Sequence, residues 1–148
     1  MSPQSLRNGY GGRCRHNTHV TDPAEVALQF VFHINRQKLD ELADMMTDNH
    51  CFDDGVNSVT VGREVMKENW RRYFELCPDY LSHLSAVYSR DNHVILLGST
   101  TGSHLQIPWH QEFEESIIWV AEIIGERVNE WRIAEVTKAE RAKWGIPE

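Results

Sequence analysis

The stretch QEFEESIIWVAEIIGERVNEWRIAEVT, residues 111–137, decides the fold class of this chain. It holds two long segments rich in β-branched and aromatic residues, 111–124 and 127–137, and such segments are typical of strands. Gly125 and Glu126 separate them and favour a tight hairpin. The two segments therefore predict a pair of long antiparallel strands.

Two further β segments precede this hairpin. Residues 80–89 and 93–104 flank a turn at residues 90–92, and residues 105–109, which contain Pro108, form a longer connection. Four strands that follow one another in this way predict an antiparallel meander. Because side chains alternate between the two faces of a strand, the meander has an inner and an outer face.

Three helices are predicted before the meander. The first begins after Asp22, because a capping carboxylate, Pro23 at the first helical position and Glu25 form a typical helix start. The second covers about residues 39–46, and the third lies between Gly62 and Pro78. Apolar residues recur at helical spacing in all three: Ala27, Phe30, Val31 and Ile34; Leu39, Leu42, Ala43 and Met46; Met66, Trp70, Tyr73, Phe74 and Cys77.

Length and composition indicate one soluble domain. The 148 residues, of which 41% are hydrophobic, suit a single core. No apolar run approaches the roughly 20 residues that a membrane span needs. The formal charge of −7 argues against a nucleic-acid partner, because backbone binding depends on clustered lysine and arginine. We therefore expect neither nucleic acid nor membrane as a partner.

The N-terminus and the cysteines bear on the domain boundary and on the cellular compartment of the protein. Residues 1–21 combine glycine, polar and basic residues, which predicts a flexible tail before a domain at residues 22–148. The tail lacks the apolar stretch of a secretory signal. Cys14, Cys51 and Cys77 are an odd number without paired spacing, which favours a reducing compartment. A cytoplasmic protein is expected.

Five segments together resemble a known family: 26–35 (VALQFVFHIN), 39–42 (LDEL), 62–64 (GRE), 70–80 (WRRYFELCPDY) and 125–131 (GERVNEW). Their order and spacing resemble the SnoaL-like branch of the nuclear transport factor 2-like superfamily. The resemblance implies an α+β fold, a cone-shaped half barrel whose curved antiparallel sheet wraps around three N-terminal helices. It also implies a pocket between sheet and helices, commonly in a homodimer.

Asp54 is the leading candidate for a catalytic base. It follows the first predicted strand, 50–52, where the ketosteroid isomerase branch of the superfamily carries its proton-abstracting carboxylate. Burial in an apolar cone would raise the pKa of that carboxylate, as a base working near neutrality needs. Adjacent strand residues point to opposite faces, so Asp53 is the alternative ligand-facing carboxylate. A plain Asp-Asp-Gly turn is the other interpretation.

The other catalytic groups of the superfamily match less well. Phe30 stands at the position of the isomerase tyrosine, so it is expected to line the ligand pocket without supplying a hydroxyl. Residues 98–104 lack the arginine and carboxylate of the limonene epoxide hydrolase branch. Gly102-Ser103-His104 resembles the first half of the polyketide cyclase pattern, in which a histidine works with a strand aspartate.

His104 and Tyr73 are the candidates to polarise a ligand oxygen, since histidine can exchange protons near neutral pH. Trp70 and Trp119 are expected to hold a flat, apolar or aromatic molecule. The plain alternatives are a surface histidine and core tryptophans. These residues therefore form a candidate site only together with Asp54.

A metal site is not expected. His104, His110 and Glu112 are close in sequence, but Pro108 interrupts the strand between the first and the other two. The resemblance implies no cofactor either.

Two functional hypotheses follow. In the first, the chain is an isomerase, dehydratase or cyclase in which Asp54 removes a proton α to a carbonyl while His104 or Tyr73 polarises the oxygen. In the second, it is a non-catalytic binding or dimeric assembly module. Apolar residues stand at both odd and even positions of a predicted strand, as in 117–120, which indicates that both faces of the sheet are covered. Because the helices are expected to cover only one face, we expect a homodimer.

Overall fold

The computed structural model describes residues 21–147, so the predicted tail, residues 1–21, lies outside the described chain except for Thr21. Helix α1, Pro23–Arg36, begins as predicted: the Asp22 carboxylate accepts a hydrogen bond from the Ala24 amide at 3.0 Å, and Pro23 is the first helical residue. Helices α2, Leu39–Asp44, and α3, Arg63–Leu76, also lie where the sequence predicts them.

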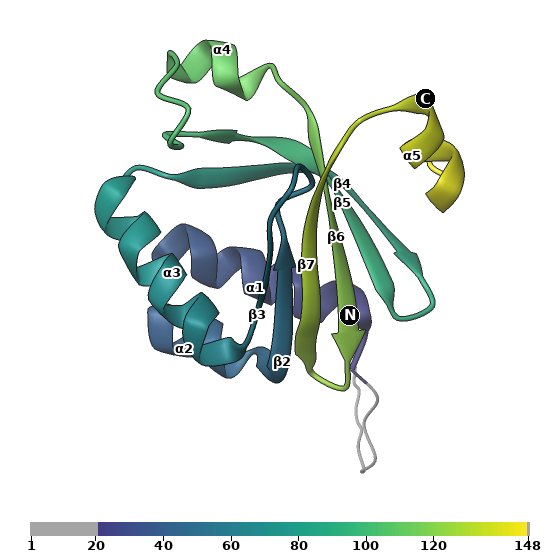
Figure 1. Cartoon of the computed structure of the whole chain (residues 1–148). Coiled ribbons are helices and arrows are strands. Elements are labelled where there is room, and N and C mark those ends of the chain that lie inside the picture. The colour runs from purple at the N-terminus through teal and green to yellow at the C-terminus, as the bar shows by residue number, and fades with distance from the viewer. Residues whose placement is uncertain (1–20, 148) are drawn as a thin grey trace, which may run out of the picture.

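The strands form one curved, unclosed sheet of six in the order β3-β2-β7-β6-β5-β4 (Figure 1). Their bounds are β2 Met46–Asp53, β3 Val59–Val61, β4 Leu81–Arg90, β5 His93–Thr101, β6 Ile117–Ile124 and β7 Arg127–Glu135. The antiparallel meander of β4 to β7 is confirmed. Strand β2 joins it by pairing parallel to β7, so the sheet is not antiparallel throughout.

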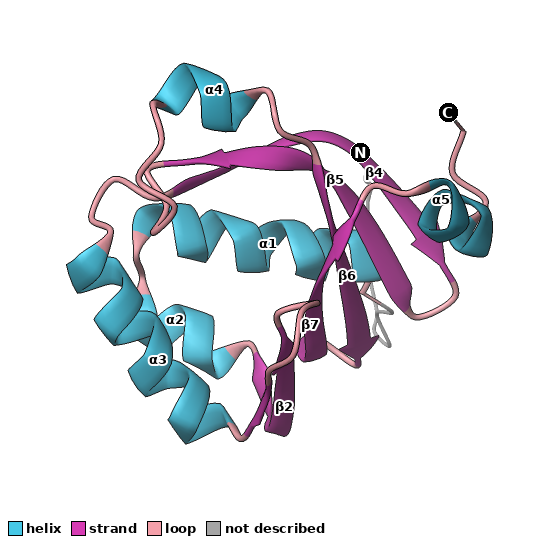
Figure 2. Cartoon of the chain, turned by 45° about the horizontal axis from the view of Figure 1, so that its top comes forward, coloured by secondary structure: helices cyan, strands magenta, loops and turns pink. Residues whose placement is uncertain are grey.

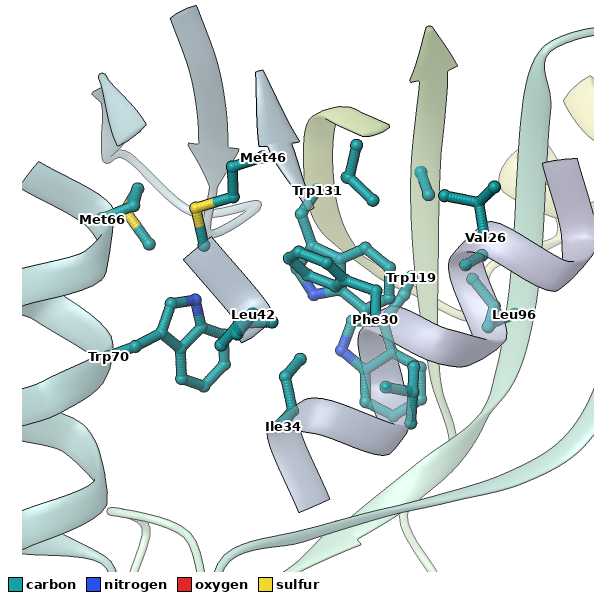
Figure 3. Close-up of a cluster of buried hydrophobic side chains, with 14 of the residues drawn as sticks. Val26, Phe30, Ile34, Leu42, Met46, Met66, Trp70, Leu96, Trp119 and Trp131 are labelled. Atoms are coloured by element: carbon teal, nitrogen blue, oxygen red, sulfur yellow. The ribbon is translucent and has the colours of Figure 1, made fainter. Parts of the chain in front are cut away.

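The main core lies between the concave face of the sheet and helices α1 to α3 (Figure 2). Phe30 of α1 packs on Trp131 of β7 with ring centroids 4.8 Å apart, and Trp119 of β6 lies beside them (Figure 3). Trp70 enters from α3 on the other side of the cluster. The inward direction of Trp131 and Trp119 follows from strand alternation.

The chain's own C-terminal segment covers part of the outer face of the sheet. Helix α5, Lys138–Trp144, lies on the side of the sheet away from α1, and Ile146 after it packs with Ile95, Ile118 and Val120. Arg132 of β7 forms an ion pair of 2.9 Å with Glu140 of α5. The expectation that the helices cover only one face is therefore wrong. The homodimer stays a prediction.

One local prediction is wrong, and one strand was not predicted. Residues 109–113 form helix α4, Trp109–Phe113, instead of beginning a strand at residue 111. Pro108 stands at the N-cap position of this short helix, and Glu112 is the residue of the helix that is buried. The burial of Glu112 therefore outweighs the β pattern of the segment that follows. Strand β3 was not predicted because three residues, Val-Thr-Val, are too few for an alternating pattern to be recognised. No helix in the described residues is long and apolar enough to cross a membrane.

Candidate functional site

A cavity of about 530 Å³ lies between helix α3 and the concave face of the sheet. Helix α3 forms one wall, the loop after β2 and the segment after β5 form its rim, and β6 and β7 form its floor. The lining side chains are mostly apolar or aromatic with a few polar groups: Phe52, Asp54, Val56, Ser58, Thr60, Met66, Asn69, Trp70, Tyr73, Tyr80, Thr100, Ser103, His104, Leu105, Ile117, Trp119, Trp131 and Ile133. This composition is typical of a small-molecule site.

Aromatic rings build the wall on the α3 side. The centroids of Trp70 and Tyr73 are 6.0 Å apart and those of Tyr73 and Tyr80 are 5.1 Å apart, both edge to face. Trp70 and Tyr73 lie one turn apart on α3, which places both toward the sheet. Trp70 and Trp119, the two predicted ligand-binding tryptophans, are both in the cavity lining.

Tyr73 and His104 form a hydrogen-bonded pair at the cavity. The Tyr73 hydroxyl oxygen lies 2.8 Å from His104 Nδ1, and it also accepts the backbone N–H of His104 at 3.2 Å. Burial raises the pKa of Tyr73 well above its usual value, so the phenol stays protonated at neutral pH. The structure thus joins two residues that the sequence singled out separately, 31 positions apart.

A glycine turn brings His104 to this position. Strand β5 ends at Thr101, three residues before the predicted end, and Gly102 then adopts the left-handed conformation with φ of +70°. A Cβ atom at Gly102 would lie 2.5 Å from the carbonyl oxygen of Asp79. Only glycine fits this backbone conformation at such close approach, and the turn directs His104 toward α3.

Asp54 lies at the rim, where it holds its own loop. Its Oδ1 accepts the backbone N–H groups of Val56 at 2.9 Å, Asn57 at 3.2 Å and Ser58 at 3.1 Å. These bonds lower the pKa of Asp54, with Val56 the largest contribution. The expectation of a raised pKa is therefore wrong, because the backbone donors stabilise the charged form by more than desolvation destabilises it.

Asp53 and Phe30 do not reach the cavity lining of the described chain. The carboxylate of Asp53 accepts the Gly55 amide at 2.9 Å within the same turn. Phe30 is fully buried in the core beside Trp131. The structure therefore places both predicted ligand-binding residues in structural contacts.

Several cavity residues were missed by the sequence analysis. Tyr80 lies at the start of a predicted strand. Thr100 and Ser103 lie in residues 98–104, a segment that was considered only for the arginine and carboxylate that it lacks. Behind them is Glu112, a buried carboxylate 2% exposed on α4. The sequence analysis named Glu112 only as a possible metal ligand, and no local signal marks it as the buried one, because Glu114 and Glu115 follow it closely.

Comparison with known proteins places these features in a family. The SnoaL-like domain family matches residues 27–131, well over half of the chain. No protein of curated function matches the sequence.

Solved structures share the fold at low sequence identity. An uncharacterised cystatin-fold protein from Novosphingobium aromaticivorans aligns with a TM-score of 0.67 and 17% identity over 78% of this chain and 99% of its own. A candidate polyketide cyclase from Sinorhizobium meliloti aligns at 0.63 and 10% over 74% and 93%. A candidate ketosteroid isomerase from Kribbella flavida aligns at 0.60 and 11% over 76% of each chain. The chain belongs to the SnoaL-like domain family of the nuclear transport factor 2-like superfamily.

Proposed function

We propose that the cavity binds a small, largely apolar carbonyl compound and that Tyr73 and His104 carry proton transfer at its α carbon. The observation that carries this proposal is the 2.8 Å contact between the Tyr73 hydroxyl and His104 Nδ1 at an aromatic-lined cavity. A hydroxyl and an imidazole joined in this way supply a hydrogen-bond donor and a base in one unit.

The contacts of the Tyr73 oxygen explain how the pair works. The oxygen can accept both the backbone N–H and the Nδ1–H of His104, since a phenol has two lone pairs. In that tautomer Tyr73 keeps its own hydrogen for a ligand oxygen, and His104 Nε2 carries a free lone pair. Nε2 takes the α proton, the C–H electron pair becomes the enolate, and the Tyr73 O–H stabilises the enolate oxygen.

Asp54 has another role in this scheme. A carboxylate whose pKa is lowered by three amide donors is a weak base, so His104 replaces it as the proton acceptor.

Polyketides and ketosteroids, the compounds after which two of the structural relatives are named, are carbonyl compounds. This chemistry supports a carbonyl ligand for the present cavity.

Ligand binding without chemistry is the second candidate function. The aromatic wall of Trp70, Tyr73 and Tyr80 favours it, because these rings can hold a flat apolar molecule unaided. The two functions share the cavity and differ in what the Tyr73–His104 pair does.

Deuterium exchange separates the two functions. 2-Tetralone, a bicyclic ketone small enough for the cavity, is incubated with the protein in D2O, and loss of its α-proton signals is followed by NMR. We expect exchange above the buffer rate and a decrease of about 10²-fold in His104→Gln, the contribution of a positioned base. Binding of 2-tetralone with no exchange above the buffer rate would leave the binding function and reject the catalytic one.

A further inference from the structure

A buried carboxylate stands directly behind the cavity wall. Glu112 Oε2 accepts the hydroxyl hydrogen of Thr100 at 2.5 Å, and Oε1 accepts the backbone N–H of Ser103 at 3.4 Å. Thr100 and Ser103 both line the cavity. The carboxylate therefore touches the cavity through these two residues.

Docking of α4 through Glu112 has no evident benefit for stability. The large apolar residues of α4 are exposed, Trp109 at 68% and Phe113 at 46%, while the carboxylate is the group that is buried. Burying a carboxylate costs desolvation energy that its hydrogen bonds offset at best. The buried carboxylate instead affects two residues of the cavity lining, Thr100 and Tyr80.

The first consequence concerns the hydroxyl of Thr100. A threonine hydroxyl has one hydrogen and two acceptor lone pairs. Thr100 lines the cavity, and because its hydroxyl hydrogen is directed to Glu112, its Oγ1 can meet a ligand only as an acceptor. The negative charge also acts on a second lining residue: the pKa of Tyr80 is raised by burial and further by Glu112.

We propose that the Thr100–Glu112 pair is a recognition subsite that selects ligands carrying a hydroxyl or N–H donor. The ligand class is an apolar or aromatic molecule with such a donor in addition to the carbonyl that meets Tyr73 and His104. This inference rests on the proposed use of the cavity as a ligand site, and it does not depend on proton transfer there.

A matched pair of probes tests the subsite. 2-Naphthol donates a hydrogen bond and 2-methoxynaphthalene does not, and quenching of tryptophan fluorescence reports the binding of each. In the wild-type protein we expect 2-naphthol to bind about tenfold more tightly, the worth of one hydrogen bond strengthened by a charged group. Thr100→Val, which removes the hydroxyl at similar volume, should bring the ratio of affinities near one.

Two further variants keep the test decisive if Thr100→Val does not fold. Thr100→Ser keeps the hydroxyl and should keep the preference. In Glu112→Gln the side-chain amide can donate to Thr100, which turns the threonine hydrogen toward the cavity and should lower the preference for 2-naphthol. Thr101→Val is the control, because this neighbouring hydroxyl contacts His83 Nε2 at 2.9 Å and is not in the lining.

The outcomes distinguish the subsite from the proposed function. Equal binding of both probes to the wild type, or an unchanged ratio in Thr100→Val, would overturn the subsite and leave the cavity as a ligand site. Failure of both probes to bind the wild type would overturn the two together. A tenfold preference without α-proton exchange would overturn the catalytic proposal alone.

Discussion

His50 makes the stability of the protein depend on pH in a way that can be traced to one side chain. It is fully buried on β2, and its Nδ1–H donates to the carbonyl of Val128 at 2.8 Å. Its Nε2 is buried without a hydrogen-bond partner among the described residues, in a position beside the ring of Phe30. Burial lowers the pKa of His50 from 6.5, because the charged imidazolium is desolvated.

The sign and size of the effect follow from this contact. Above pH 6.5 His50 is neutral in the folded and unfolded chains, so its contribution to stability is fully present. As the pH falls below 6.5, the unfolded chain binds a proton that the folded chain resists, and the free energy of unfolding decreases. One proton limits the slope to about 1.4 kcal/mol per pH unit, and the loss continues until the pH passes the folded pKa.

Urea unfolding followed by tryptophan fluorescence at pH 5.0 to 7.5 measures this slope. His50→Asn keeps a donor near the Val128 carbonyl but cannot titrate, so it should be less stable at every pH and lose this part of the slope. The control is His110→Asn, at an exposed position on α4, which should keep the wild-type slope. An identical slope for wild type and His50→Asn would refute the assignment.

Three further predictions concern the core, the rim and the outer face. Phe30→Ala should lower the free energy of unfolding by about 3–5 kcal/mol, measured by urea unfolding, because it leaves a cavity beside Trp131; a loss below 1 kcal/mol would contradict its place in the core. Asp54→Asn should reduce α-proton exchange less than tenfold, against the 10²- to 10⁴-fold loss expected of a general base, and a loss in that larger range would restore Asp54 as the base. A chain ending at Val136 lacks α5 and Ile146, so it should associate more strongly in light scattering than the full chain, which we expect to be a homodimer. Full-length monomers at micromolar concentration would contradict the predicted dimer.

Features encoded by local pattern could be predicted from the sequence. The helix start at Asp22 depends on contacts within three residues. Strand alternation puts Trp131 and Ile133 on the same face, and the structure shows that this face lines the cavity. Helix α4 could not be predicted, because it depends on Glu112 reaching Thr100 across a turn. The cover of the outer face was missed for a similar reason, since α5 shows its role only when packed on the sheet.

The candidate site was predictable as residue types and not as an arrangement. Tyr73 and His104 were each identified, but their pairing depends on the left-handed turn at Gly102. The sequence also suggested that Asp54 follows a strand. Whether its carboxylate would meet apolar side chains or backbone amides depends on the path of the next four residues, which pattern alone does not specify.

A double-mutant cycle on α-proton exchange tests the central claim most directly. The rate for 2-tetralone is measured in the wild type, Tyr73→Phe, His104→Gln and the double variant. Residues that act as one unit are strongly non-additive, so the double variant should be no slower than about the slower single variant. Losses that multiply, or full exchange in His104→Gln, would contradict a Tyr73–His104 pair as the group that moves the proton.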